Sequence, residues 1–172
     1  MSRRGQLVLV AAILIAVAIA PLVLAALQLG YHEDVRATAD HGSPTAATLR
    51  VLDRSVPAAS AGVPGEYSWS RRRAAVTEVR SELAVSLDRL RTGGVRDGVV
   101  RTVQYNSTVA TGWRRTNCPG GPDRAFGPCR VDRGVVVQER TGRTHVLAVG
   151  FDVRVTTQRG ETAVTVVVPV SG

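Results

Sequence analysis

The longest apolar stretch of the chain lies near its N-terminus. Residues 7–27 include no charged residue and are interrupted only by Pro21. About 20 apolar residues in a helix cross a hydrocarbon core of roughly 30 Å. The pattern therefore predicts a transmembrane helix over residues 6–30, with a basic leader, residues 1–5, before it and one outer domain, residues 31–172, after it.

The charges that flank this stretch predict its direction. Arg3 and Arg4 precede it, and Glu33 and Asp34 follow it. By the positive-inside rule, the N-terminus is then cytoplasmic and the C-terminal domain extracytoplasmic, as in a single-pass protein of the cell membrane whose first partner is the lipid bilayer. A cleaved secretory signal peptide is the rival interpretation, but its apolar region should span only about 7–15 residues. The greater length favours a retained anchor.

Helical patterns come first in the outer domain. Ser43 followed by Pro44 is typical of a helix start, and this helix should stop at Pro57. A second, clearer helix is predicted by apolar residues three and four positions apart, and it should end at Gly93. Its apolar face consists of Val76, Val79, Leu83, Leu87 and Leu90. Residues 99–113 fit a further helix, which we favour, although the first half would serve equally well as a strand.

The pattern changes to a period of two near the C-terminus. Residues 145–157 alternate, and the run is flanked by valine-rich segments, residues 134–140 and 162–170, with glycine-containing turns between them. Three such strands predict an antiparallel meander, and therefore an α+β fold. One face of the middle strand should be buried against the clearer helix, and it carries Val149, Phe151, Val153 and Val155. The unbroken valine runs leave a second possibility open, a sheet covered on both faces.

Composition narrows the classes of partner. The net charge is +8, and all 22 basic residues are arginine. Nucleic acid is not expected as a partner, because the charge is dispersed and aromatic residues make up only 4% of the chain. Three arginines, residues 71–73, come just before the clearer helix, where the helix dipole disfavours cations. This conflict suggests an anionic partner, although a solvated basic turn is the commoner explanation.

The two cysteines, Cys118 and Cys129, bracket a turn-rich segment. It contains three glycines and three prolines but no histidine, so the roughly four ligands of a zinc site are missing. Outside the cytoplasm such a pair is read as a disulfide. Two free thiols remain the alternative if the topology is inverted.

Other candidate chemistry is sparse. Asn106 begins an Asn-Ser-Thr sequon and is a possible N-glycosylation site, provided that its side chain is exposed. The histidines, His32, His41 and His145, have neither metal-binding spacing nor a nearby nucleophile. No pattern suggests a catalytic site, a cofactor or a metal, so we do not expect an enzyme.

The opening residues, Met-Ser-Arg-Arg-Gly-Gln, stand directly before the apolar stretch and resemble a class III (prepilin-type) signal. By that resemblance a prepilin peptidase cuts between Gly5 and Gln6, and the apolar helix is retained. The start Arg-Gly-Gln-Leu-Val-Leu-Val-Ala-Ala and the stretch from Asn117 to Cys129 also resemble small pilin-like membrane proteins of halophilic archaea. The alternative is that the basic residues and Gly5 are only the positive flank of a membrane helix.

The resemblance implies a function in assembly. The chain would be a pilin-like or minor-pilin subunit of a cell-surface or type IV pilus-like assembly, non-catalytic, contacting other pilin-like subunits through its N-terminal helix. The implied fold is a pilin-like arrangement of a long N-terminal transmembrane helix, outer helices and the three-stranded meander. The alternative is a single-pass membrane-anchored protein whose outer domain binds an envelope component or a partner protein.

Overall fold

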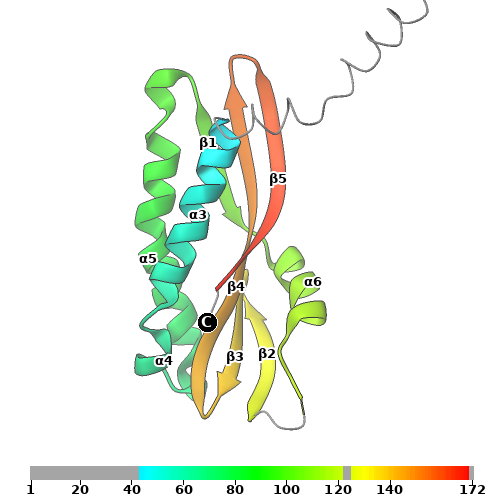
Figure 1. The fold of residues 1–172 in the computed structure, drawn as a ribbon. Helices are drawn as coiled ribbons and strands as arrows, with labels where there is room; N and C mark the ends of the chain where they lie inside the picture. The colour runs from blue at the N-terminus through cyan, green and yellow to red at the C-terminus, as the bar shows by residue number, and fades with distance from the viewer. Residues whose placement is uncertain (1–42, 122–124, 171–172) are drawn as a thin grey trace, which may run out of the picture. The chain divides into compact units, whose positions relative to one another are not determined.

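In the computed structural model, which describes residues 43–121 and 125–170, an antiparallel sheet has helices on both faces (Figure 1). Helices α3 (Pro44–Ser60) and α5 (Arg72–Thr92) cover one face. The shorter α6 (Ser107–Asn117) covers part of the other. The large apolar cluster lies between the sheet and the helix pair, and a smaller one lies beneath α6.

Helix α3 begins as expected, but it runs further. The hydroxyl of Ser43 caps its first turn by accepting a hydrogen bond of 3.1 Å from the backbone N–H of Ala46. The helix was expected to stop at Pro57, yet it continues to Ser60. Val56 and Ser60, on its buried face, are 0% and 3% exposed, so packing on both sides of the proline holds the helix together.

A short connection leads into α5. It contains the single turn α4 (Val63–Glu66) and the 3-10 turn η1 (Trp69–Arg71). Helix α5 carries the apolar face predicted from its spacing and ends at Gly93, whose N–H donates to the carbonyl of Arg89 at 2.8 Å. A second 3-10 turn, η2 (Val95–Asp97), then leads to the sheet.

Five strands form the sheet: β1 (Val100–Tyr105), β2 (Phe126–Asp132), β3 (Val135–Arg140), β4 (Arg143–Thr157) and β5 (Gly160–Pro169). The long strand β4 is central. One of its edges pairs first with β3 and then with β1, and its other edge pairs with β5. Strand β2 adds to the outer side of β3, and all pairs are antiparallel. Strands β2 to β5 thus form a meander. Strand β1 pairs with the same edge of β4 as β3 does, further along β4.

The expected three-stranded sheet is therefore corrected to five strands. Strands β3, β4 and β5 occupy the predicted segments, β1 occupies the segment for which a strand was the alternative to the favoured helix, and β2 was not predicted. Residues 99–113 were expected to be helical, but the chain changes from β1 to α6 at Asn106. Strand β1 is a strand because it pairs with the second half of β4, some fifty positions away, and the local pattern could not decide between strand and helix without that partner. Strand β2 contains Pro128, which an edge strand tolerates.

The predicted register of β4 is confirmed. The four apolar residues expected on one face are at most 3% exposed and pack with Val79, Leu83 and Leu87 of α5. Asp152 and Arg154, on the opposite face, are exposed. The sheet is also covered on both faces where α6 crosses it, because Val136 and Ala148 are buried in the second cluster.

The expected single-pass membrane topology is also corrected. No helix among the described residues is long and apolar enough to cross a membrane. The segment on which the expectation rested, residues 6–30, lies outside the described residues, as does the leader over residues 1–5. The structure therefore gives no support to a long N-terminal transmembrane helix or to a pilin-like fold built on one.

Candidate functional site

The outer edge of β5 is the most extensive unpaired feature of the sheet. Strand β5 pairs with β4 over its full length, and within residues 43–121 and 125–170 no other strand pairs with it. Most of its residues are exposed, although the strand is rich in valine. A valine-rich strand with a free edge is a place where another strand can add.

The neighbouring hydrogen bonds show which backbone groups of β5 point outward. The N–H of Gly150 donates to Gly134 at 2.9 Å, and the carbonyl of Gly150 accepts from Asn106 at 2.8 Å, both on the side of β4 away from β5. Val167, which faces Gly150, therefore directs its own N–H and carbonyl away from β4. By alternation the outward groups belong to Glu161, Ala163, Thr165 and Val167.

This edge lacks the usual protection against pairing. Natural edge strands carry lysine, proline, bulges or inward charges that discourage another strand. Strand β5 has a regular register without a bulge, and its one proline, Pro169, is at the very end. Its one charged residue, Glu161, is at the other end and accepts a hydrogen bond of 2.7 Å from Arg154. The middle of the strand is free of charge.

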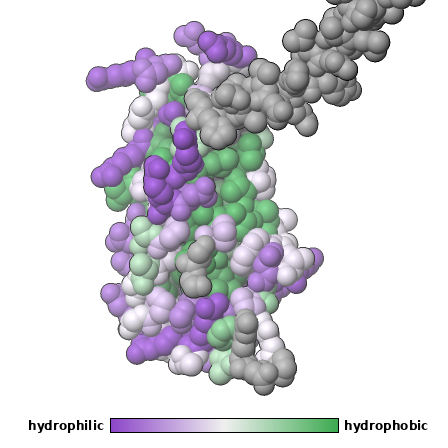
Figure 2. Space-filling view, viewed as in Figure 1, coloured by the Kyte–Doolittle hydropathy of each residue, from purple (hydrophilic) through white to green (hydrophobic). Residues whose placement is uncertain are grey.

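A hydrophobic strip lies beside the edge. Figure 2 shows it between α3 and β5. Leu49 and Val51 of α3, together with Val166 and Val170, pack against the main core and remain partly exposed. A strand or helix placed along β5 would cover apolar surface as well as backbone groups.

A polar network ties β5 to the start of α6. Both carboxylate oxygens of Asp152 accept from the side-chain amide of Asn106 at 2.9 Å, and one accepts from the hydroxyl of Thr165 at 2.6 Å. These hydrogen bonds, led by that of Thr165, lower the pKa of Asp152 below its ordinary value. The amide oxygen of Asn106 also accepts from the N–H of Val109 at 2.9 Å and so caps α6. The sequon asparagine is thus half-buried and works as a structural cap.

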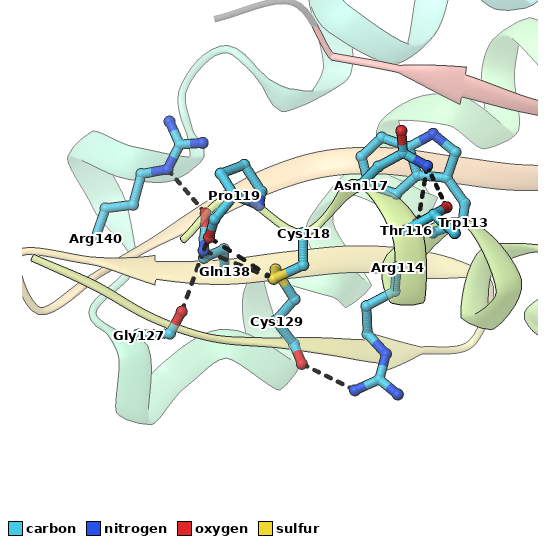
Figure 3. The surroundings of a disulfide bond; sticks show 10 residues. All are labelled: Trp113, Arg114, Thr116, Asn117, Cys118, Pro119, Gly127, Cys129, Gln138 and Arg140. Atoms are coloured by element: carbon cyan, nitrogen blue, oxygen red, sulfur yellow. Dashed lines mark hydrogen bonds between the residues drawn. A yellow bond between two sulfur atoms is a disulfide. The ribbon is translucent and has the colours of Figure 1, made fainter. Parts of the chain in front are cut away.

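The two cysteines form a disulfide between the end of α6 and β2 (Figure 3). The fully buried Gln138 organises the chain beside it. Its amide N–H groups donate to the carbonyl of Pro119 at 2.7 Å and to that of Gly127 at 3.1 Å. Its amide oxygen accepts from Arg140 at 3.2 Å. These hydrogen bonds hold Pro119 and Gly127 beside β3.

A pocket of about 550 Å³ lies next to this segment. It lies beside the part of β4 between Arg143, which forms a bridge with Ser68, and Ala148, where pairing with β5 begins. Its lining comes from α3, α4 and α6 and from the strands β3, β4 and β5, and it includes Pro57, Pro64, Trp113, Pro119, His145 and Pro169. Prolines and one indole ring make it suited to an apolar or peptide ligand more than to a charged one.

Within the described part of the chain, no three histidines, cysteines or carboxylates gather in a way that could hold a metal ion. His145 is partly buried beside Arg140, and burial first and then that charge lower its pKa. A lowered pKa favours the neutral form of the imidazole. His32, His41, Gly5 and Gln6 lie outside the described residues.

Sequence reasoning missed the site that the fold makes most prominent. The segment of β5 was predicted to be a strand, but nothing in its residues indicates that it stands at an edge. Gln138 was not singled out either, because a glutamine in a strand is ordinarily exposed. Its position directly after three consecutive valines, residues 135–137, was the one signal that could have identified it.

Fold and site together define a small α+β domain, with a disulfide, helices on both sheet faces and, among the described residues, an unpaired outer edge on β5. The chain belongs to DUF7261, a family of unknown function, whose profile matches residues 1–169. Neither the curated proteins nor the solved structures gave a match.

Proposed function

We propose that the protein is a non-catalytic subunit of a pilus-like or other cell-surface assembly, and that β5 is a contact through which its domain joins a second copy. The open edge of β5 carries this proposal. The disulfide agrees with it, because such bonds persist in oxidising compartments.

Strand β5 can pair with itself in antiparallel fashion about Val164. This register places Glu161 opposite Val167 and Ala163 opposite Thr165, so no like charges meet. All four outward residues of each strand would then bond, giving about eight hydrogen bonds across the two-fold axis. A continuous sheet would run through both copies.

Hydrogen bonds along the edge of β5 do not by themselves supply the free energy that stable association of two copies requires. Eight hydrogen bonds at about 0.5–1.5 kcal/mol net would contribute roughly 4–12 kcal/mol. Association costs an estimated 4–15 kcal/mol, so edge pairing alone gives weak association at best. Burial of the hydrophobic strip between α3 and β5 would supply the difference, at about 25 cal/mol per Å² of apolar surface.

The test is the change Ala163→Pro. Residue 163 points its N–H outward, so proline there removes an edge donor and leaves the β4–β5 ladder intact. Sedimentation of the full chain should show concentration-dependent association in the wild type and a clear loss in Ala163→Pro. The matched variant Ala163→Ser keeps the N–H and should associate as the wild type does. A monomeric wild type at high concentration, or equal association of both variants, would overturn the proposal.

The pilin-like form of the proposal has its own test. If the first residues are a prepilin-type signal, the mature chain begins at Gln6, and Gly5→Val blocks cutting. Mass spectrometry of the N-terminus in cells with an active prepilin peptidase measures this directly. An intact Met1 there would rule out processing and leave a non-pilin assembly as the function.

The pocket beside the disulfide favours a second candidate, a domain that binds an envelope component or a partner protein. A short proline-containing peptide would fit its apolar lining. Trp113 is half-exposed in this pocket, so its fluorescence should report binding. Trp113→Ala should abolish such binding, whereas Trp69→Ala, which changes an indole that does not line the pocket, should not.

A further inference from the structure

A second cleft, of about 260 Å³, lies between the first turn of α5 and the edge strand β2. Arginines line it from both elements, with Arg72 and Arg73 on α5 and Arg130 on β2. The remaining lining residues are three valines and a single acidic residue, Asp132. The cleft is therefore basic on two sides.

Some of the charged side chains at this cleft have an ion-pair or hydrogen-bond partner and others do not. The carboxylate of Asp132 already pairs with Arg133 at 3.3 Å. Arg133 also donates to the hydroxyl of Thr77 at 2.8 Å, so it is held in place. The side chains of Arg73 and Arg130 are exposed and make no hydrogen bond or ion pair with any other residue that the structure describes. Among the described residues, the guanidinium groups of Arg73 and Arg130 thus line the cleft without an ion-pair partner of their own.

The surroundings add to the positive potential. Arg72, which also lines the cleft, lies over the ring of Trp69 at 5.0 Å and donates to the carbonyl of the same residue at 3.2 Å, so its side chain is held in place. The first turn of α5 contains no acidic residue. Arginines close together repel one another, and an anion between them would remove that repulsion.

We propose that this cleft binds a phosphate dianion, either inorganic phosphate or the phosphate group of a monoester. The planar fork of an arginine donates two parallel hydrogen bonds to phosphate, and two such forks match the charge of a dianion. A carboxylate carries one charge and two oxygens, so it can satisfy only one of them fully. The volume of about 260 Å³ is several times the roughly 30 Å³ that a water molecule occupies, which leaves room for phosphate and its remaining water.

The experiment is an NMR titration of the full ¹⁵N-labelled chain at low salt with inorganic phosphate, glycerol 3-phosphate and acetate. Both phosphates should give saturable shifts in the first turn of α5 and in β2. The double variant Arg73→Gln/Arg130→Gln should bind phosphate at least about tenfold more weakly, as expected for the loss of charge-assisted bonds. Affinity for the ester should also fall as the pH is lowered through about 6, because its dianion becomes a monoanion.

The control is Arg96→Gln/Arg159→Gln. It removes the same charge from two exposed arginines that do not line the cleft, and it should leave affinity nearly unchanged. Thermal unfolding of each variant verifies that it is folded. Tighter binding of the ester than of inorganic phosphate would indicate that the ligand is a phosphate group carried on a larger molecule. Equal binding of the two would indicate that the ligand is free phosphate. Both results support the proposal. Absence of saturable shifts, equal affinity of the double variant and wild type, or acetate binding as tightly as phosphate would overturn it.

Discussion

Replacing Gly150 by alanine should destabilise the domain, because α6 begins directly over this residue of β4. A Cβ at position 150 would lie 2.6 Å from the carbonyl oxygen of Asn106, 2.8 Å from Cγ1 of Val109 and 3.1 Å from the N of Ala110. Two of these atoms are backbone, so rotation of a side chain cannot relieve the clash. The start of α6 would have to move away from the sheet.

The cost follows from what this movement disturbs. Overpacking a well-packed site costs about 1–3 kcal/mol, and here the shift would also strain the cap that Asn106 provides. We therefore expect a loss of about 2–3 kcal/mol. For a domain of this size that lowers Tm by roughly 6–15 °C. Urea unfolding followed by tryptophan fluorescence should show a lower midpoint with an unchanged slope.

The matched control is a glycine within α6, the helix that packs on Gly150. Gly112 has no atom within 4 Å of an added Cβ. Gly112→Ala should therefore stabilise α6 by about 0.5–1 kcal/mol through helix propensity alone. If Gly150→Ala were as stable as the wild type, α6 would not be seated on β4 as described, and the reasoning would be refuted.

Four further variants test the core, the disulfide and the polar network. Phe151→Ala should cost about 3–5 kcal/mol in urea unfolding, whereas Arg154→Ala, which removes only an exposed ion pair, should cost less than about 1 kcal/mol. Replacing both cysteines by serine should cost about 3 kcal/mol, measured against the oxidised wild type. Hydrogen bonds from Thr165 and Asn106 lower the pKa of Asp152 from 3.8, so its carboxylate stabilises the fold above that pH and this contribution is lost as the pH falls through the lowered value. In urea midpoints between about pH 2 and 6, Asp152→Asn should lack this part of the acid sensitivity.

Local patterns determined a large part of this fold. The spacing of apolar residues located α5, and the alternation in residues 145–157 determined which face of β4 is buried. Glycine-containing turns located the last two hairpins, as at Gly142, whose φ of 76° few other residues adopt. The sequence also singled out both cysteines and Asn106. These features depend on residues within a few positions of one another, and such signals survive in a single sequence.

Only the tertiary structure decided how the strands are ordered. Strand β1 is a strand because the far half of β4 offers it a partner, and β5 is an edge because nothing else in the described chain pairs beyond it. The basic cleft likewise joins Arg73 and Arg130, which are far apart in sequence. The valines of β3 are buried on both faces because α6 crosses the second one. The pairing of strands and the covering of a sheet face by a helix are contacts between segments far apart in the sequence. The local pattern of residues does not determine the free energy of such contacts.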